Sequence, residues 1–274
     1  MSLFCCPICS APLERLEQVY RCPNRHSYDI AAQGYTYLLP VSRKHSKAPG
    51  DDKVMSAARK AFLARDYYAP LQRALCRLAC DLAPQGTVRV LDSGCGEGYY
   101  TAALYHALAQ TRKVQLAGID ISKFILRTAA RRLKEGEFAV ASAYHLPLEA
   151  DSVDLLLDCF APLAAEEFRR VLRPGGHFLY VVPAARHLWQ FKEVLYDTPY
   201  PNEEKREAYP GFSYVDVVPV RDTIHLNCRE DIENLLTMTP YVWRTGSAGK
   251  ERLAALEELD TEIAFDIHVF RREN

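Results

Sequence analysis

A short apolar run that ends in a glycine-rich turn is the feature of this chain that most restricts its fold. Residues 88–92, Val-Arg-Val-Leu-Asp, have the character of a buried strand, and the turn 93–98, Ser-Gly-Cys-Gly-Glu-Gly, follows directly. Its glycines permit a tight turn and let a ligand lie close to the backbone. A helical pattern over 99–108 comes next. The sequence therefore predicts a strand–loop–helix unit with a ligand site at the turn.

Strand and helix patterns alternate after this unit, which predicts an α/β protein with an open, doubly wound, mostly parallel sheet. We expect strands at 88–92, 114–120, 138–141, 153–157 and 177–182, and helices at 99–108, 123–133 and 165–171. We also expect helices over 55–82 with a break near 66–70, a loop over 200–212, strands at 214–220 and 262–271, and a helix at 231–238 with Asp231 as its N-cap.

Two cofactors compete for the glycine-rich turn. A dinucleotide loop reads G-x-G-x-x-G/A, and the place of its last small residue is taken by Tyr99. The observed D-x-G-x-G-x-G over 92–98 resembles instead the first motif of class I S-adenosylmethionine-dependent methyltransferases. Asp120 ends the second strand and matches the acid that binds the ribose diol. Leu-Arg-Pro-Gly-Gly at 172–176 is also typical of that superfamily. A glycine turn without a ligand is the remaining alternative.

This resemblance implies how the cofactor lies. The glycines approach its methionine part, the residues after the third strand contact adenine, and 158–162 faces the methyl group. The implied cofactor-binding residues are Asp92, Gly94, Gly96, Glu97, Gly98, Tyr99, Tyr100, Asp120, Ile121, Ser142 and Ala143.

Four soft ligands near the N-terminus predict a structural zinc site. Cys6, Cys9, Cys22 and His26 have the spacing C-x2-C-x12-C-x3-H. Two ligand pairs on neighbouring turns can converge tetrahedrally on Zn²⁺, with no position left open for catalysis. Because the segment is too small to bury a core of its own, we expect the metal to supply its folding energy. Buried or free cysteines beside an incidental histidine are the alternative, and Cys5 is expected outside the ligand set.

The chain divides by composition into three parts. Residues 1–36 form the predicted zinc-binding module, for which RNA recognition is implied by a family resemblance given below, 37–54 a basic linker and 55–274 the methyltransferase domain. Within the last part, we expect leading helices over 55–84, the cofactor-binding half over 85–185, and the C-terminal strands and helix over 186–274.

Positive charge is concentrated at the N-terminal end. The whole chain has a formal net charge of −1, whereas residues 1–65 hold ten Lys and Arg against five Asp and Glu. A simple polycation is therefore excluded, and a local nucleic-acid patch is expected. Candidate phosphate contacts are Arg43, Lys44, His45 and Lys47. Candidate stacking residues are Tyr20, Tyr28, Tyr35 and Tyr37, which can equally form the small core of the module. A solvated basic surface is the alternative reading of the charge.

An ordered set of short motifs is similar to the bacterial 23S rRNA (guanine-N1)-methyltransferases over nearly the whole chain. The motifs are C-P-x-C and C-P-x-x-H within 6–26, then 34–40, 49–51, 58–63, 68–71, 94–101, 160–162, 183–188 and 238–240. The resemblance implies a 23S rRNA hairpin as substrate, a zinc module that helps to recognise it, and a homodimer whose halves form an RNA cleft. It further implies that Tyr68 and His187 help to hold the cofactor, although either side chain can simply pack. Family members include housekeeping and macrolide-resistance enzymes.

The expected reaction is in-line transfer of the sulfonium methyl group to N1 of a guanine in the hairpin loop. N1 lies on the Watson–Crick edge, so the base must be unpaired or flipped. Catalysis is expected to rest on proximity, with the N1 proton passing to Asp158 or to water. Expected catalytic residues are Asp158, Phe160 as a stacking ring, and Pro162. Asp158 departs from the family, which more often has an uncharged or basic residue there, and a strand-end carboxylate without a proton-transfer role is the alternative.

Two other functions remain open at this point. A small-molecule methyltransferase shares the cofactor loop but does not need a basic zinc module. A non-catalytic RNA-binding protein with a vestigial fold is disfavoured by the intact loop and Asp120. No apolar run approaches the roughly 18 residues of a membrane span, and the N-terminus does not read as a signal peptide. Nine cysteines without a secretion signal suit a reducing compartment, so we expect a cytoplasmic protein with no membrane partner.

Overall fold

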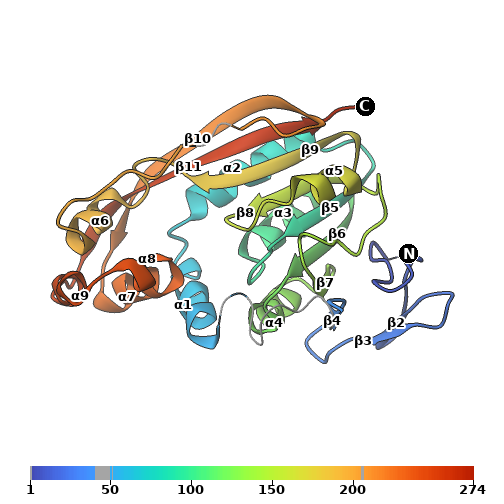
Figure 1. Ribbon diagram of the computed structural model, residues 1–274, viewed down its shortest axis with the longest axis horizontal. Coiled ribbons are helices and arrows are strands. Elements are labelled where there is room, and N and C mark those ends of the chain that lie inside the picture. The colour runs from blue at the N-terminus through green and yellow to red at the C-terminus, as the bar shows by residue number, and fades with distance from the viewer. Residues whose placement is uncertain (1, 41–49, 51, 205–206) are drawn as a thin grey trace.

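An eight-stranded sheet is the frame of the computed structural model, which describes residues 2–40, 50, 52–204 and 207–274 (Figure 1). The strand order is β10-β11-β9-β8-β5-β6-β7-β4. Neighbours from β9 to β4 pair in parallel, and β10 and β11 add two antiparallel strands at one edge. The strands are β4 Tyr35–Tyr37, β5 Thr87–Ser93, β6 Lys113–Asp120, β7 Glu137–Val140, β8 Val153–Cys159, β9 Leu172–Pro183, β10 Phe212–Leu226 and β11 Leu259–Arg272. This confirms the predicted α/β class.

Helices cover one face of the sheet. Alternate strand residues point to opposite faces, and Val90, Leu116 and Val140 are buried on this one, in the same core as the first four helices. These are α1 Lys53–Leu63, α2 Ala69–Leu82, α3 Tyr99–Ala109 and α4 Lys123–Arg132. A second group of helices gathers where β10 ends and β11 begins, and there α7 packs against α1 (Figure 1). It consists of α6 Trp189–Leu195, α7 Arg229–Met238, α8 Tyr241–Arg244 and α9 Ser247–Ala254.

The N-terminal segment covers part of the other face of the sheet. It contains a small antiparallel sheet of β1 Glu14–Leu16, β2 Val19–Arg21 and β3 Ser27–Asp29. Its apolar side chains share one core with residues such as Ala117, Ile119 and Ala139, and α5 Ala165–Val171 completes this layer. Glu137 of β7 accepts hydrogen bonds from the Tyr20 hydroxyl at 2.8 Å and from the Leu3 N–H at 2.9 Å. Packing against the sheet therefore stabilises the segment in addition to any bound metal.

Strand β4 joins this segment to the main sheet. It pairs in parallel with β7, so that Tyr35 lies opposite Phe138. The predicted boundary after residue 36 thus falls inside a strand, and the three-part division stays a prediction about folding units. The predicted linker cations Arg43, Lys44, His45 and Lys47 lie outside the described residues.

Most predicted elements between 88 and 182 are confirmed, including the helix at 165–171. The prediction for Asp231 is wrong: Cys228 is the N-cap of α7, and Asp231 is buried in its first turn. There the Asp231 carboxylate accepts a hydrogen bond from the Tyr67 hydroxyl at 2.7 Å and pairs with Arg65 at 3.4 Å. Strand β10 is also longer than the predicted 214–220, and α6, α8 and α9 were not predicted. Across the described residues, no helix combines the length and apolar character needed to span a bilayer.

Gly98 offers a direct test of how the glycine turn meets the helical layer. It precedes α3 with φ +79°, and an added Cβ would lie 3.0 Å from Cα of Ala129 in α4. Gly86 has a similar φ of +83° with no heavy atom within 4 Å of such a Cβ. We expect Gly86→Ala to lower the free energy of unfolding by about 1 kcal/mol, the cost of left-handed backbone. Gly98→Ala should cost a further 1–3 kcal/mol or so, because it also overpacks the contact with α4. Urea unfolding of both variants measures this, and equal losses would contradict the packing argument.

Candidate cofactor cavity and metal centre

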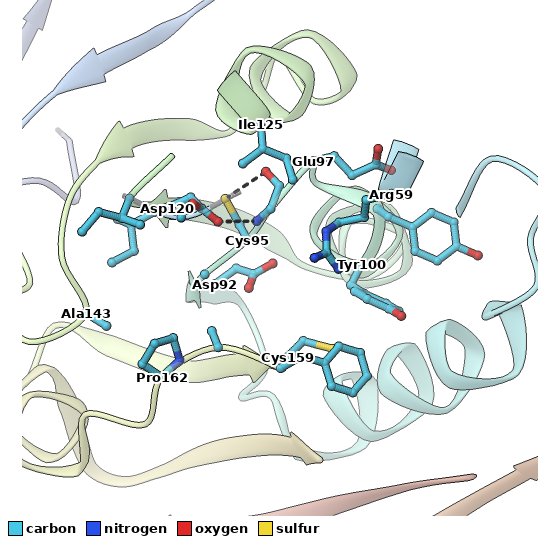
Figure 2. Close-up of a pocket in the computed structure, with 18 of the residues that line it drawn as sticks. Arg59, Asp92, Cys95, Glu97, Tyr100, Asp120, Ile125, Ala143, Cys159 and Pro162 are labelled. Carbon is cyan, nitrogen blue, oxygen red and sulfur yellow. Dashed lines mark hydrogen bonds between the residues drawn. The ribbon is translucent and has the colours of Figure 1, made fainter. Parts of the chain in front are cut away.

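A cavity of about 380 Å³ lies at the carboxyl ends of β5, β6 and β8 (Figure 2). The sheet splays here because the chain leaves β5 for β6 on one side and reaches β8 on the other. Its size is typical of a site for a small molecule. Eleven of the thirteen predicted cofactor residues line it: Tyr68, Asp92, Gly94, Gly96, Glu97, Tyr99, Tyr100, Asp120, Ile121, Ser142 and Ala143. Gly98 and His187 do not.

Asp120 fixes the glycine loop to the second strand. Its Oδ2 accepts the N–H of Gly96 at 3.1 Å (Figure 2). Its Oδ1 accepts the N–H of Ser122 at 2.8 Å. The loop is held further by the N–H groups of Gly94 and Cys95, which both donate to the carbonyl of Ile119 at 2.9 Å. Asp120 thus ends β6 at the cavity, in the position of the acid that would bind a ribose diol.

The glycines of the loop mainly permit close contacts within the protein. A Cβ on Gly94 would lie 2.3 Å from Cβ of Ala161, and Gly98 lies against α4. Gly96 has room, with Ile125 at 3.7 Å from such a Cβ. The loop therefore brings the end of β5, the segment after β8 and α4 together around the cavity.

Buried acids without full hydrogen bonding face this cavity. Asp92 accepts a hydrogen bond from Thr101 at 2.5 Å, and burial raises its pKa to about 7. Within the described residues, Asp92 Oδ1 and the Tyr100 hydroxyl lack a hydrogen-bond partner. Glu97 lies 2.8 Å from Arg132, and burial also raises its pKa. Buried polar groups normally have partners, so these atoms fit a polar ligand such as S-adenosylmethionine.

Tyr68 and His187 lie together, but only Tyr68 reaches the cavity. The Tyr68 oxygen is 3.5 Å from Nε2 of His187, and Nδ1 of His187 accepts the N–H of Ala264 at 3.2 Å. Burial lowers the pKa of His187 to about 3, so the ring is neutral with its proton on Nε2, facing Tyr68. His187 therefore positions Tyr68.

The three predicted catalytic residues separate in the structure. Phe160 and Pro162 line the cavity, and the Phe160 ring is 41% exposed on a backbone with φ +60°, a strained conformation for a bulky residue. Asp158 is fully buried and does not line the cavity. Its Oδ1 accepts the N–H of Ala161 at 3.1 Å, and burial raises its pKa well above the usual range. Asp158 is thus placed to hold the turn that carries Phe160.

Arg59 is the cavity residue that sequence reasoning missed. It is the only cation among the described lining residues, and it lies on the side opposite Asp120 and Ala143 (Figure 2). Its guanidinium donates to the carbonyl of Met238 at 3.2 Å, which links α1 to the end of α7. The motif at 58–63 contains Arg59, but nothing in its helical pattern distinguishes it from Lys60.

The four predicted metal ligands converge. Their ligand atoms lie within 4.8 Å of one another. His26 Nδ1 is 3.5 Å from Cys6 Sγ and 3.4 Å from Cys22 Sγ, and Cys9 Sγ is 3.8 Å from Cys22 Sγ. A tetrahedron with ordinary zinc bond lengths has edges of about 3.8 Å between sulfurs and about 3.6 Å between sulfur and nitrogen. These residues therefore fit a zinc ion.

The surroundings of the cluster support this ligand set. A hydrogen bond from Asn24, with another from the Ala11 backbone, lowers the pKa of Cys9 to about 6, which favours the thiolate that zinc requires. Cys5 stands outside the cluster, and burial raises its pKa to about 11. Tyr20 and Tyr35 are buried and so cannot stack on RNA bases, whereas Tyr37 is exposed.

Comparison with known proteins assigns both parts of the chain. Residues 4–47 match the family model described as RlmA, N-terminal, and residues 85–215 match a methyltransferase domain. A putative 23S rRNA (guanine-N(1)-)-methyltransferase of Micromonospora griseorubida is 35% identical, covering 94% of this chain and 93% of its own. The 23S rRNA (guanine(748)-N(1))-methyltransferase of Streptomyces fradiae is 33% identical, covering 96% and 95%. The chain belongs to the 23S rRNA (guanine-N1)-methyltransferase family. The cofactors of this methyltransferase are accordingly S-adenosylmethionine and a structural zinc ion.

A solved structure supports the fold of the methyltransferase. The YcgJ protein of Bacillus subtilis superposes with a TM-score of 0.51 at 16% identity, covering 74% of this chain and 99% of its own. Together with the methyltransferase-domain match over residues 85–215, this shared fold confirms the predicted class I methyltransferase fold.

Zinc content tests the ligand set of the methyltransferase. We expect about one zinc per chain in the wild-type protein and in Cys5→Ser, whose thiol is outside the cluster. Cys9→Ser removes one of four ligands and should lower zinc affinity at least tenfold, measured by metal analysis after dialysis against a competing chelator. Loss of zinc from Cys5→Ser with retention in Cys9→Ser would contradict the assignment.

Asp92 should make the stability of the cofactor-free methyltransferase depend on pH. Its folded pKa of about 7 lies above that of an unfolded aspartate, so the folded state holds a proton that the unfolded state has lost, and stability falls as pH rises toward 7. The stability of Asp92→Asn should not fall in this way, because asparagine does not titrate. Its free energy of unfolding relative to wild type should therefore increase by up to about 3 kcal/mol between pH 5 and 8. Urea unfolding at both pH values measures this difference, and a constant difference would show that Asp92 does not titrate in this range.

Proposed function

We propose that this methyltransferase transfers a methyl group from S-adenosylmethionine to N1 of a guanine in a hairpin loop of 23S rRNA. The observation that carries the proposal is the similarity to 23S rRNA (guanine-N1)-methyltransferases over more than nine-tenths of the chain. The N-terminal family match over residues 4–47 includes the four predicted zinc ligands, and residues 2–40, which hold these ligands, are called the zinc segment below. A small-molecule methyltransferase would explain the cavity but not the zinc segment.

The charges around the cavity suit one orientation of the cofactor. Asp120 and Ala143 lie on one side, where they suit the ribose diol and adenine, and Arg59 and Tyr100 lie on the other (Figure 2). Arg59 is placed to pair with the α-carboxylate of the methionine part, and Asp92 lies between the two sides as an acceptor for its α-amino group. When bound, S-adenosylmethionine supplies an activated sulfonium methyl group.

The remaining residues shape the entry for the target base. The exposed ring of Phe160 and the side chain of Pro162 lie at the cavity, where they can stack on a flipped guanine. Transfer would exchange the methyl–sulfur bond of the cofactor for a bond to N1, and the N1 proton would have to leave. Because the carboxyl group of Asp158 is buried outside the cavity, we assign this proton to water. Asp158 acts through the turn that positions Phe160.

Three further proposals rest on the family resemblance: the protein acts in the cytoplasm, it forms a homodimer, and it contributes to macrolide resistance. Sedimentation of the purified protein tests the homodimer. Growth of a sensitive strain that expresses it, at rising macrolide concentration, tests the third.

Methylation of defined substrates tests the proposed reaction. The protein is incubated with methyl-labelled S-adenosylmethionine and either unmodified 23S rRNA, tRNA or a small-molecule extract. We expect label in 23S rRNA and one sharp reverse-transcription stop at a hairpin guanine, because an N1 methyl group blocks pairing. Label only in the small-molecule fraction would overturn the substrate, and failure to bind S-adenosylmethionine would favour a non-catalytic RNA-binding protein.

Arg59 gives a separate prediction about cofactor binding. Arg59→Gln keeps a donor for the Met238 carbonyl but removes the charge, so we expect S-adenosylhomocysteine to bind about 10–100-fold more weakly, the usual value of a charge-assisted hydrogen bond. Binding of 5′-methylthioadenosine, which has no carboxylate, should not change. The matched control is Lys60→Gln, the exposed neighbour on α1. Calorimetry measures the affinity of the wild type and both variants for each ligand. An equal loss of affinity for the two ligands in Arg59→Gln would place Arg59 away from the carboxylate.

A further inference from the structure

One face of α4 carries a row of exposed cations. Lys123, Arg127 and Arg131 follow one another at four-residue intervals, and all three are exposed. Four residues bring a helix slightly more than one turn forward, so the row is about 12 Å long. The opposite face of α4 is apolar and buried in the core. The row is therefore not needed to pack the helix.

The row is not balanced by acids. Within the described part of the chain, no carboxylate pairs with Lys123, Arg127 or Arg131, whereas the adjacent Arg132 pairs with Glu97 at 2.8 Å. The half-buried ring of Phe124 holds cations from two helices, with Lys53 Nζ at 5.6 Å, Lys123 Nζ at 5.5 Å and the Arg127 guanidinium at 5.9 Å. Like charges four residues apart destabilise a helix, so a bound polyanion would relieve a cost that the isolated protein bears.

The row lies beside the cofactor cavity. Ile125, on the inner side of α4, lines that cavity, and Gly96 approaches it (Figure 2). One helix diameter of about 10 Å thus separates the basic row from the cofactor site. An RNA strand along the row would have its loop bases within reach of the cavity mouth.

We propose that Lys123, Arg127 and Arg131, with Lys53 at the start of α1, form a phosphate-binding surface that holds the substrate RNA beside the cavity. The inference rests on the proposed function for its partner. The contacts are to the RNA backbone, so they are independent of base sequence and sensitive to salt. The surface is separate from the zinc segment, which packs on the other face of the sheet.

Paired arginines on another helix provide a matched control. Arg127→Gln/Arg131→Gln removes two exposed charges four residues apart from α4, and Arg73→Gln/Arg77→Gln does the same on α2, which α3 separates from α4. Both proteins are tested for binding to an unmodified 23S rRNA transcript between 50 and 200 mM salt. We expect the α4 variant to bind about tenfold more weakly at low salt, with a log–log salt slope shallower by about 1.4, and the α2 variant to match wild type. Affinity for S-adenosylhomocysteine should stay unchanged in both.

Two results would overturn the surface: an equal loss in both variants, or an unchanged salt slope in the α4 variant. Loss of binding to anionic phosphatidylserine vesicles with unchanged RNA binding would assign the row to a membrane instead. Because binding is measured without methyl transfer, a wild-type protein that binds the transcript but does not methylate it would contradict the proposed reaction and leave the row to be judged on the variants.

Discussion

The contact between the zinc segment and the second face of the sheet ties the N-terminal part of the chain to the strands that carry the cofactor loop. A buried parallel sheet needs apolar cover on both faces, and the second face has α5 over one part and the zinc segment over the β6–β7 part. Tyr20 and Leu3 fasten that segment to Glu137 at the start of β7, and β4 extends the sheet beside it. Strand β6 ends in Asp120, so the cover supports the strand that holds the cofactor loop.

The sheet and the helices around it place the charged side chains that line the cavity. The ends of the parallel strands bring Asp120 to one side of the cavity and Asp92 to its middle, and α1 brings Arg59 to the other side. The α1 helix is held there by α7, through contacts such as the hydrogen bond from Arg59 to Met238. Helix α7 therefore helps to shape the cofactor site, although it is more than 100 residues from the glycine loop in sequence. The basic row on α4 uses the outer side of an element whose inner side lines the same cavity.

The sequence predicted correctly those features that depend on residues close together in the chain. The glycine turn and the C-x2-C pair depend on a few neighbouring residues, so the loop and the zinc ligands were predicted from spacing. Long-range packing decided the rest. Asp231 has the residue type of an N-cap, but pairing with Tyr67 and Arg65 places it inside the first turn. Asp158 ends the expected strand, but its side chain bonds to Ala161 and turns away from the cavity. Arg59 gains its place only through helices distant in sequence.

We expect the zinc segment, the sheet and the cofactor loop to form one cooperative unit. Amide hydrogen exchange, measured by mass spectrometry on the zinc-loaded and chelator-treated protein, tests it most directly. Zinc removal should increase exchange in residues 2–40 and also in β6 and β7, because these strands lose their cover. An increase confined to residues 2–40, with β6 and β7 as protected as before, would show instead that the zinc segment is an independent appendage.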